Sequence, residues 1–304
     1  MAFFKMLARR RGWATLSLVL PPALWLVLFL VVPYLALLVQ SFLAADEYGN
    51  VVFTPTLGHY RDFFTKPVYY GTLLYTFETA AIVTVGCVLL SVPLAYFIAF
   101  KVKRYKSLLY TLIIVPLWVS YIVRTYAWKI ILGRAGILNT FLLYIHAVDA
   151  PVEAFLYSRW AVVVGLVHIF TPFVLMPIYT AFEHIPRPLL EASKDLGAGR
   201  FTTFRRVVLP LALPGIIAGG TFAFVLTLGD FLAVLLLGGP DTLMISNVVQ
   251  NLFGTSDDRP LGSAIGIVML FIVLAILELT ARAERSLANV ESSASGGRLG
   301  GVKR

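Results

Sequence analysis

The sequence predicts an all-α, polytopic membrane protein with six transmembrane helices. Of its 304 residues, 59% are hydrophobic and only 13% are charged, and the mean hydropathy is +0.85. Soluble domains usually carry about 25% charged residues, so this composition indicates an integral membrane protein. The hydrophobic residues fall into runs that are long enough, at about 1.5 Å per residue, to cross a bilayer. We expect spans at residues 16–39, 72–100, 107–132, 160–182, 211–237 and 261–282.

The charge pattern between these runs predicts the orientation of the chain. The proposed inner segments, at 1–15, 101–106, 183–210 and 283–304, each hold at least four Lys and Arg, whereas the other connecting segments hold at most two. Cytoplasmic loops carry an excess of basic residues, so we expect both termini and the 183–210 loop in the cytoplasm. The tail at 283–304 is rich in Ser, Gly and Arg, and we expect it to be disordered.

The loop at 183–210 is predicted to contain a helix, a break and a second helix. Residues 189–196 and 201–209 both have helical periodicity. Gly197 and Gly199, which lie between them, allow a sharp turn that a residue with a Cβ would resist. A short rigid element held outside the membrane is suited to receive a push from a partner.

A spaced motif runs through this loop. It consists of Glu191-Ala192-Ser193, Gly197, Val207 and Leu209-Pro210. The motif resembles the EAA signature of the permease subunits of bacterial ABC importers, which is Glu-Ala-Ala, three residues, Gly, nine residues, Ile, one residue and Leu-Pro. The spacing matches in full. Ser193 replaces the third-position Ala and Val207 replaces Ile, and both changes are small in shape.

The resemblance implies that the loop docks on an ATP-hydrolysing partner. The residues expected to take part in this coupling are Leu190, Glu191, Ala192, Ser193, Lys194, Gly197, Leu209 and Pro210. A helix docked in a cleft needs small residues where backbones approach, which suits Ala192 and Ser193. Gly197 at a left-handed C-cap position would fix the exit direction. Pro210 and Pro214 admit a bend before the fifth span.

The same resemblance implies a fold, a location and partners. The expected fold is that of a type I ABC importer permease (MetI-like) over residues 16–282, in the bacterial inner membrane. The implied partners are two ATP-binding subunits, a homologous second permease and a periplasmic substrate-binding protein, besides the lipid bilayer. No Gly-x-x-x-x-Gly-Lys-Ser/Thr loop occurs, so we expect no cofactor in this chain and ATP bound by the partners. The net charge of +9 comes from bases at the ends of apolar runs, so we expect no nucleic-acid partner.

More of the chain resembles the polyamine (spermidine/putrescine) branch of the family. The similarity runs from about residue 30 to residue 275 and includes PLWVS at 116–120, RTYAW at 124–128, GILNT at 136–140, LGDF at 228–231 and LGGP at 237–240. It implies a small organic, cationic solute. The same branch is known for opine-like compounds, other organic cations and iron, so the substrate stays open. Family members typically place Glu where this chain has Asp230, and the shorter side chain changes the fit of a substrate.

Ionisable groups inside spans mark a candidate substrate path, because such groups are costly and usually face a cavity or each other. The candidates are Glu78, Trp118, Tyr121, Tyr126 and Asp230. The acids would attract a cation, and each aromatic face would add roughly 0.5–2 kcal/mol for an ammonium group. The alternative is that Glu78 or Asp230 pairs with Arg124 or Lys129 and only braces the bundle.

Together these observations favour a permease subunit that works by alternating access driven by partner ATPases. The alternative is a secondary transporter or channel that needs no ATP, which explains six spans and intramembrane acids but not the spaced loop. A membrane hydrolase is a more distant alternative, since no Gly-x-Ser-x-Gly or His-Glu-x-x-His motif occurs. The single cysteine, Cys87, excludes an intrachain disulfide.

Overall fold

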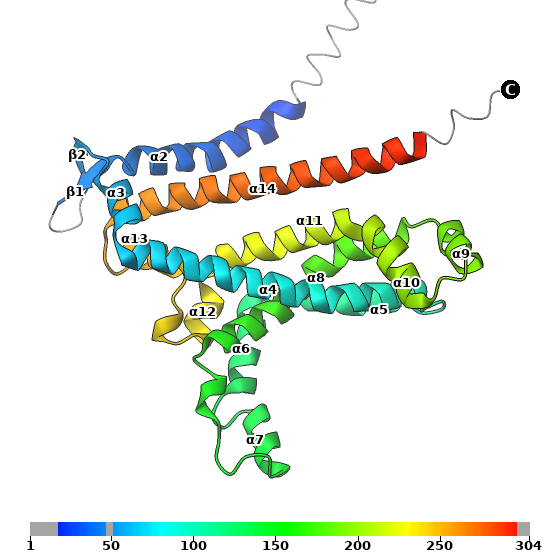
Figure 1. Ribbon diagram of the computed structural model, residues 1–304. Helices are drawn as coiled ribbons and strands as arrows, with labels where there is room; N and C mark the ends of the chain where they lie inside the picture. Colours follow the sequence, from blue (N-terminus) through cyan, green and yellow to red (C-terminus); the bar gives the residue numbers. More distant parts are fainter. Residues whose placement is uncertain (1–17, 47–50, 297–304) are drawn as a thin grey trace, which may run out of the picture. The chain divides into compact units, whose positions relative to one another are not determined.

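The computed structural model describes residues 18–46 and 51–296, with side chains as far as 286, and its long elements are helices (Figure 1). Strands β1 (Leu43–Ala45) and β2 (Val51–Pro55) form one short antiparallel pair, the only sheet within these residues. The predicted all-α fold class is therefore confirmed. Among the described residues, five helices are long and apolar enough to cross a membrane, or six if one sharply bent pair is a single span.

The chain forms two compact units. Among the described residues, the first consists of those up to 66 together with 249–270, and the second consists of 67–248 together with those from 271 to 296. The predicted N-terminal segment at 1–15 lies outside the described residues.

The first unit contains the first span and a hairpin. Its helical parts are the apolar helix Leu18–Gln40, which comprises the π-helical turn η1 (Val27–Val31) and α2 (Val32–Gln40), then α3 (Gly58–Thr65) and the beginning of α14 (Arg259–Gly296). Ser263 of α14 donates a hydrogen bond to Gln40 Oε1 at 3.1 Å, which joins α14 to the last turn of the first span. The β1–β2 hairpin and α3 lie between the first two predicted spans, at 40–71.

The core of the second unit consists of three long helices that lie side by side (Figure 1). They are α4 (Pro67–Phe100), α8 (Arg159–Glu183) and α11 (Leu209–Leu228). Most of the buried residues of the unit lie on them, and α8 contributes fully buried Leu166, Val174 and Ile178. Lipid tails are as apolar as these side chains, so close packing rather than exclusion of water holds such helices together.

Two glycines allow α11 to approach α8 closely. A Cβ added at Gly215 would lie 2.5 Å from the Cβ of Ala181 and 2.7 Å from the carbonyl oxygen of Pro177. A Cβ at Gly219 would lie 2.8 Å from the carbonyl oxygen of Val174. These distances are too short for real contacts, so any side chain at either position would push the two helices apart.

The predicted third span, at 107–132, is wrong as a single helix. α5 (Lys106–Ile114) and the 3₁₀ turn η2 (Val115–Trp118) are followed by α6 (Tyr121–Leu132), and the helix direction changes by 94° between them. Pro116 has no backbone N–H to donate, and the backbone after η2 is extended at Val119. The helix therefore stops part-way along the apolar run.

The predicted fifth span, at 211–237, differs from the structure at both ends. α10 (Arg200–Thr203), the π-helical turn η4 (Phe204–Val208) and α11 form one helix over Arg200–Leu228. Pro210 and Pro214, which admit a bend, lie within this helix, and Pro210 directly follows the π-helical turn. At its other end the helix stops at Leu228 and restarts as α12 (Leu232–Leu237).

The remaining elements connect these helices. They are α7 (Ile137–Tyr144), η3 (Glu153–Phe155), α9 (Arg187–Asp195), η5 (Pro240–Thr242) and α13 (Ile245–Phe253). α7 lies in the connection that follows the predicted third span. α14 continues to Gly296, so the prediction of a disordered tail from residue 283 was wrong over that part of the helix, and 297–304 lie outside the described residues.

Replacing Gly215 with alanine should lower stability by about 1–3 kcal/mol, because the added methyl group overpacks the α8–α11 contact. Gly220→Ala is the matched control, since a Cβ there meets its nearest atom at an ordinary 3.5 Å. The measurement is the thermal midpoint of each variant purified in detergent. Equal midpoints for the two variants would show that the close approach at Gly215 does not hold the helices.

Candidate functional site

The helix α9, which carries most of the spaced motif, ends in a Schellman motif. Gly197 has φ +76°, in the left-handed region. Ala198 N–H donates to the Ser193 carbonyl at 3.0 Å, and Gly197 N–H donates to the Lys194 carbonyl at 2.8 Å. Gly199 instead has φ −66° and ψ 165°, a conformation open to any residue, so the prediction that both glycines are needed for the turn was wrong for Gly199.

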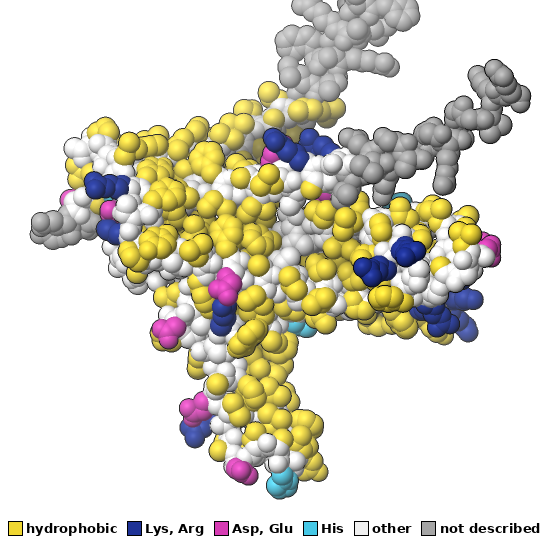
Figure 2. Space-filling view, in the orientation of Figure 1, with side chains coloured by type: hydrophobic (Ala, Val, Ile, Leu, Met, Phe, Trp, Pro, Cys, Tyr) yellow, Lys and Arg dark blue, Asp and Glu magenta, His cyan; other side chains and the backbone are white. Residues whose placement is uncertain are grey.

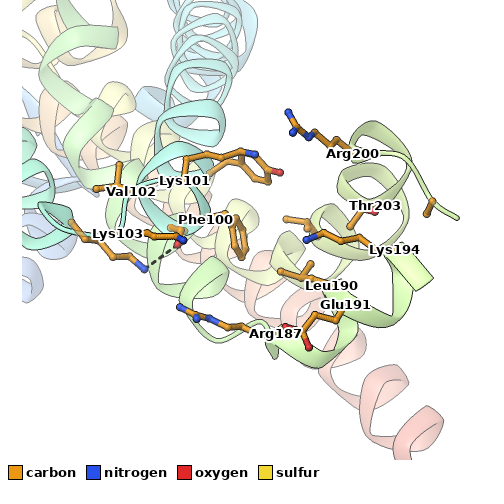
Figure 3. Close-up of a pocket in the computed structure, with 15 residues that line it drawn as sticks. Phe100, Lys101, Val102, Lys103, Arg187, Leu190, Glu191, Lys194, Arg200 and Thr203 are labelled. Carbon is orange, nitrogen blue, oxygen red and sulfur yellow. Dashed lines mark hydrogen bonds between the residues drawn. The ribbon is translucent and has the colours of Figure 1, made fainter. Parts of the chain in front are cut away.

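α9 presents different residues in three directions. Arg187, Leu190, Glu191 and Lys194 line a cleft of about 690 Å³ (Figure 3). Ser193 Oγ lies 2.9 Å from Thr203 Oγ1 and joins α9 to α10. The third direction, which no element of the second unit covers within the described part of the chain, presents Leu189, Ala192 and Leu196, the last with 88% of its surface exposed.

The cleft lies between α9, α10 and the end of α4. Lys and Arg side chains gather on this part of the surface, around α9 and α10 (Figure 2). Leu209 and Pro210, the last two residues of the spaced motif, do not line it. They begin α11, immediately after the π-helical turn. The structure therefore divides the predicted coupling residues into a helix beside the cleft and the start of a long span.

Lys106 ties three helix ends together beside this cleft. Its Nζ donates to the carbonyl of Ala99 at 3.0 Å and to the carboxylate of Glu183, and it lies 5.8 Å from the centre of the Tyr179 ring. These partners come from the end of α4 and the end of α8, while Lys106 begins α5. Since α9 follows Glu183 after three residues, this contact fixes the base from which α9 projects.

Asp230 occupies the break between α11 and α12, and it contacts the break in the third span. Its Oδ1 accepts a hydrogen bond from Ala233 N–H at 2.9 Å, and its other oxygen accepts one from the Tyr121 hydroxyl. Tyr121 is the first residue of α6, just after the bend. Ser246 Oγ donates to the Asp230 carbonyl at 2.6 Å and Asn247 Nδ2 to the Phe231 carbonyl at 2.9 Å. The two broken helices therefore meet at Asp230.

The second acidic candidate, Glu78, lies in a separate cluster. Its Oε1 accepts a hydrogen bond from Arg159 Nη1 at 3.1 Å, between α4 and the first residue of α8. The Arg159 guanidinium also lies 4.7 Å from the centre of the Tyr75 ring. Nε and Nη2 of Arg159 are buried without a hydrogen-bond partner among the described atoms. The arrangement leaves two buried donors beside a partly exposed carboxylate.

The proposed braces from Arg124 and Lys129 do not form. Arg124 donates to the Ile169 carbonyl at 3.4 Å, and Lys129 lies over the rings of Tyr126 and Tyr157. The acids are braced by Tyr121 and Arg159 instead. Of the aromatic candidates, only Tyr121 contacts an acidic one, and Trp118 has 81% of its surface exposed.

Several residues of these sites were missed by sequence reasoning. They are Lys106, Arg159, Glu183, Ser246 and Asn247. Lys106 and Arg159 stand at the ends of apolar runs, where basic residues normally serve orientation, so their charge pattern did not mark them. A polar Ser-Asn pair next to an apolar segment was the available signal for the last two, because interrupted helices leave backbone groups that side chains must satisfy.

Comparison with known proteins shows the family. Residues 91–287 match the model of the binding-protein-dependent transport system inner membrane component. The chain is 38% identical over 263 residues to the spermidine/putrescine transport system permease protein PotB of Escherichia coli strain K12, which covers 86% of this chain and 95% of that protein. It is 34% identical over 288 residues to the inner membrane ABC transporter permease protein YdcU of the same strain, covering 89% and 90%.

Solved structures show the same fold. A bacterial ABC transporter that imports the acidic polysaccharide alginate matches with a TM-score of 0.71 at 18% identity, over 91% of this chain and 96% of that one. The methionine ABC transporter MetNI in an inward-facing conformation matches with a TM-score of 0.56 at 16% identity, over 73% and 99%. The fold and the helix-borne motif thus define a membrane permease rather than an enzyme. The chain belongs to the family of binding-protein-dependent ABC importer permeases, multi-pass proteins of the inner membrane.

Replacing Tyr121 with phenylalanine should destabilise the protein by about 2 kcal/mol, because it removes a hydrogen bond to a carboxylate between two broken helices. Tyr126→Phe is the control on the same helix, since its hydroxyl has no hydrogen bond among the described residues and its ring contact with Lys129 survives. Unfolding in detergent with rising dodecyl sulfate, followed by circular dichroism, gives the difference. An equal loss of stability in both variants would show that the hydrogen bond from Tyr121 to Asp230 does not hold the two broken helices together.

Proposed function

We propose that this chain is one of two homologous permease subunits of an ABC importer for a small organic cation of the polyamine type. A periplasmic binding protein would deliver the solute, and two ATPase subunits would bind and hydrolyse ATP. The single observation that carries the substrate class is the likeness to a spermidine/putrescine permease over 86% of the chain. Opines, other organic cations and iron are the competing solutes.

The coupling mechanism follows from helix continuity. An ATPase that closes on α9 would push on its outward residues, Leu189, Ala192 and Leu196. The Schellman turn and the Ser193–Thr203 contact would pass that push into the helix that begins at Arg200. That helix runs unbroken to Leu228, so its far end moves Asp230 and the two breaks. Leu209 and Pro210 lie within this helix and transmit the push, while Leu190, Glu191 and Lys194 hold α9 beside the cleft.

Gly197→Val should insert and assemble with its partners yet lose substrate-stimulated ATP hydrolysis and uptake. A β-branched residue at a left-handed position costs about 1–2 kcal/mol, so α9 would leave its cap and meet the ATPase wrongly. Gly199→Val is the matched control, because both glycines have open space around a Cβ and only Gly197 has a positive φ. Both activities are measured in the same proteoliposomes, and normal values for Gly197→Val would remove α9 from the mechanism.

Asp230 is the proposed cation contact on the substrate path, and Tyr121 is its aromatic neighbour. Tyr126, Trp118 and Glu78 are the further candidates for that path. Asparagine at 230 keeps the volume and the acceptor for Ala233 N–H but removes the charge. We expect Asp230→Asn to raise the KM for spermidine about tenfold, equivalent to about 1.4 kcal/mol. The readout is uptake of labelled spermidine, putrescine, an opine and iron by the reconstituted importer.

The control for this experiment is Tyr121→Phe, which removes the hydrogen bond to Asp230 but leaves the charge of Asp230 in place. If the two variants lower stability alike and leave the KM unchanged, Asp230 only braces the breaks. If wild-type vesicles take up an opine or iron and no polyamine, the proposed substrate class fails while the coupling mechanism stands.

We also propose that both termini and α9 face the cytoplasm, on the strength of the basic residues in those segments. With Cys87 replaced by alanine, a cysteine at Asp258 should react with an impermeant thiol reagent added to intact cells. A cysteine at Arg205 should react only after the cells are opened. Labelling of position 205 from outside would reverse the proposed orientation.

A further inference from the structure

The cleft beside α9 holds more positive charge than its own acids balance. Its basic lining residues are Lys101, Lys103, Lys106, Arg187, Lys194 and Arg200. Glu191 is the one acidic residue in the lining. Within the described part of the chain, Lys106 alone of the six bases forms an ion pair with a carboxylate, that of Glu183. Five bases therefore share a concave site with a single carboxylate.

The floor of this cleft is apolar and fixed. Tyr96 and Phe100 of α4 line it, and the Tyr96 ring packs edge-on against Phe204 with centroids 5.4 Å apart. Buried Val208 completes the floor. A volume of about 690 Å³ lies in the range of sites that enclose a small organic group. The cleft thus combines a rigid, partly aromatic base with a rim of cations.

We propose that this cleft binds the phosphate-bearing headgroup of an anionic phospholipid. The bases come from the level at which α4 and α8 end and α5 begins, which is where headgroups lie if these helices span the membrane. Basic pockets between the ends of spans suit lipid phosphates, and arginine offers them paired donors. Phe97, four residues before Lys101, and Leu108 and Leu112, in the two turns of α5 after Lys106, are exposed, as the acyl chains of such a lipid require.

The proposed lipid site and the proposed ATPase contact lie on different sides of α9. The outward side is apolar at Leu189, Ala192 and Leu196, and it suits a protein surface. The cleft side is recessed and basic at Arg187 and Lys194. A bound headgroup would join α9 electrostatically to the turn after α4, so the anionic lipid content of the membrane would influence how firmly α9 is held.

The test is lipid retention by the purified importer complex in native mass spectrometry. The complex is titrated with dioctanoyl phosphatidylglycerol, with dioctanoyl phosphatidylcholine as the neutral lipid and inorganic phosphate as the free anion. We expect the wild type to retain phosphatidylglycerol preferentially. K101Q/R200Q should weaken that retention about tenfold, since each base near a lipid phosphate contributes to binding. R205Q/R206Q is the matched control, because it removes the same amount of charge from the helix that begins at Arg200, but from positions outside the cleft.

Three results would overturn the proposal. One is equal retention of the two lipids, or equal weakening by both double variants. Another is displacement of phosphatidylglycerol by an equal concentration of inorganic phosphate, which would assign the cleft to a free anion. The third is loss of the ATPase subunits from the K101Q/R200Q complex while the lipid is retained, which would assign the cleft to the ATPase. Intact complexes for both double variants on gel filtration show that the comparison is between folded proteins.

Discussion

Backbone groups at the ends of interrupted helices need partners, because the hydrocarbon of a bilayer offers none. Two apolar runs of this chain stop part-way, after Trp118 and after Leu228. The second break is satisfied by Asp230, whose side chain caps α12, and by Ser246 and Asn247, which serve the carbonyls of Asp230 and Phe231. The Tyr121 hydroxyl then attaches the first break to the same carboxylate. The rest of the fold is arranged around this helix break, whose backbone groups have hydrogen-bond partners.

The second interruption determines where the long helix Arg200–Leu228 ends. One end carries the turn that leads from α9, and the other ends beside Asp230. Discontinuous helices commonly form the substrate sites of membrane transporters, since unwound backbone exposes polar groups at that depth. A single rigid element therefore connects the surface helix to the polar centre. Close contact with α8 at Gly215 and Gly219 holds that element against the core.

Sequence patterns predicted the features that depend on composition and spacing. Run lengths placed the long helices, and the spaced motif located α9 and its left-handed glycine. These patterns could not place the two interruptions, because PLWVS and LGDF lie inside long apolar runs and only tertiary partners decide that the helix stops there. They could not pair the acids either. The sequence offered Arg124 and Lys129 as partners for Glu78 and Asp230. In the structure the partners are Tyr121 and Arg159, because helix packing determines which side chains meet.

Ser193 is a departure from the family signature, and its contact with Thr203 makes the departure consequential. The two hydroxyls lie 2.9 Å apart, and Thr203 is buried. An alanine at 193 would leave the threonine hydroxyl without this partner, which costs about 1–3 kcal/mol when such a group stays dry. The side chains at positions 193 and 203 therefore depend on each other. A chimera that joins the α9 of a relative to this chain at the glycine turn would have to exchange both residues together.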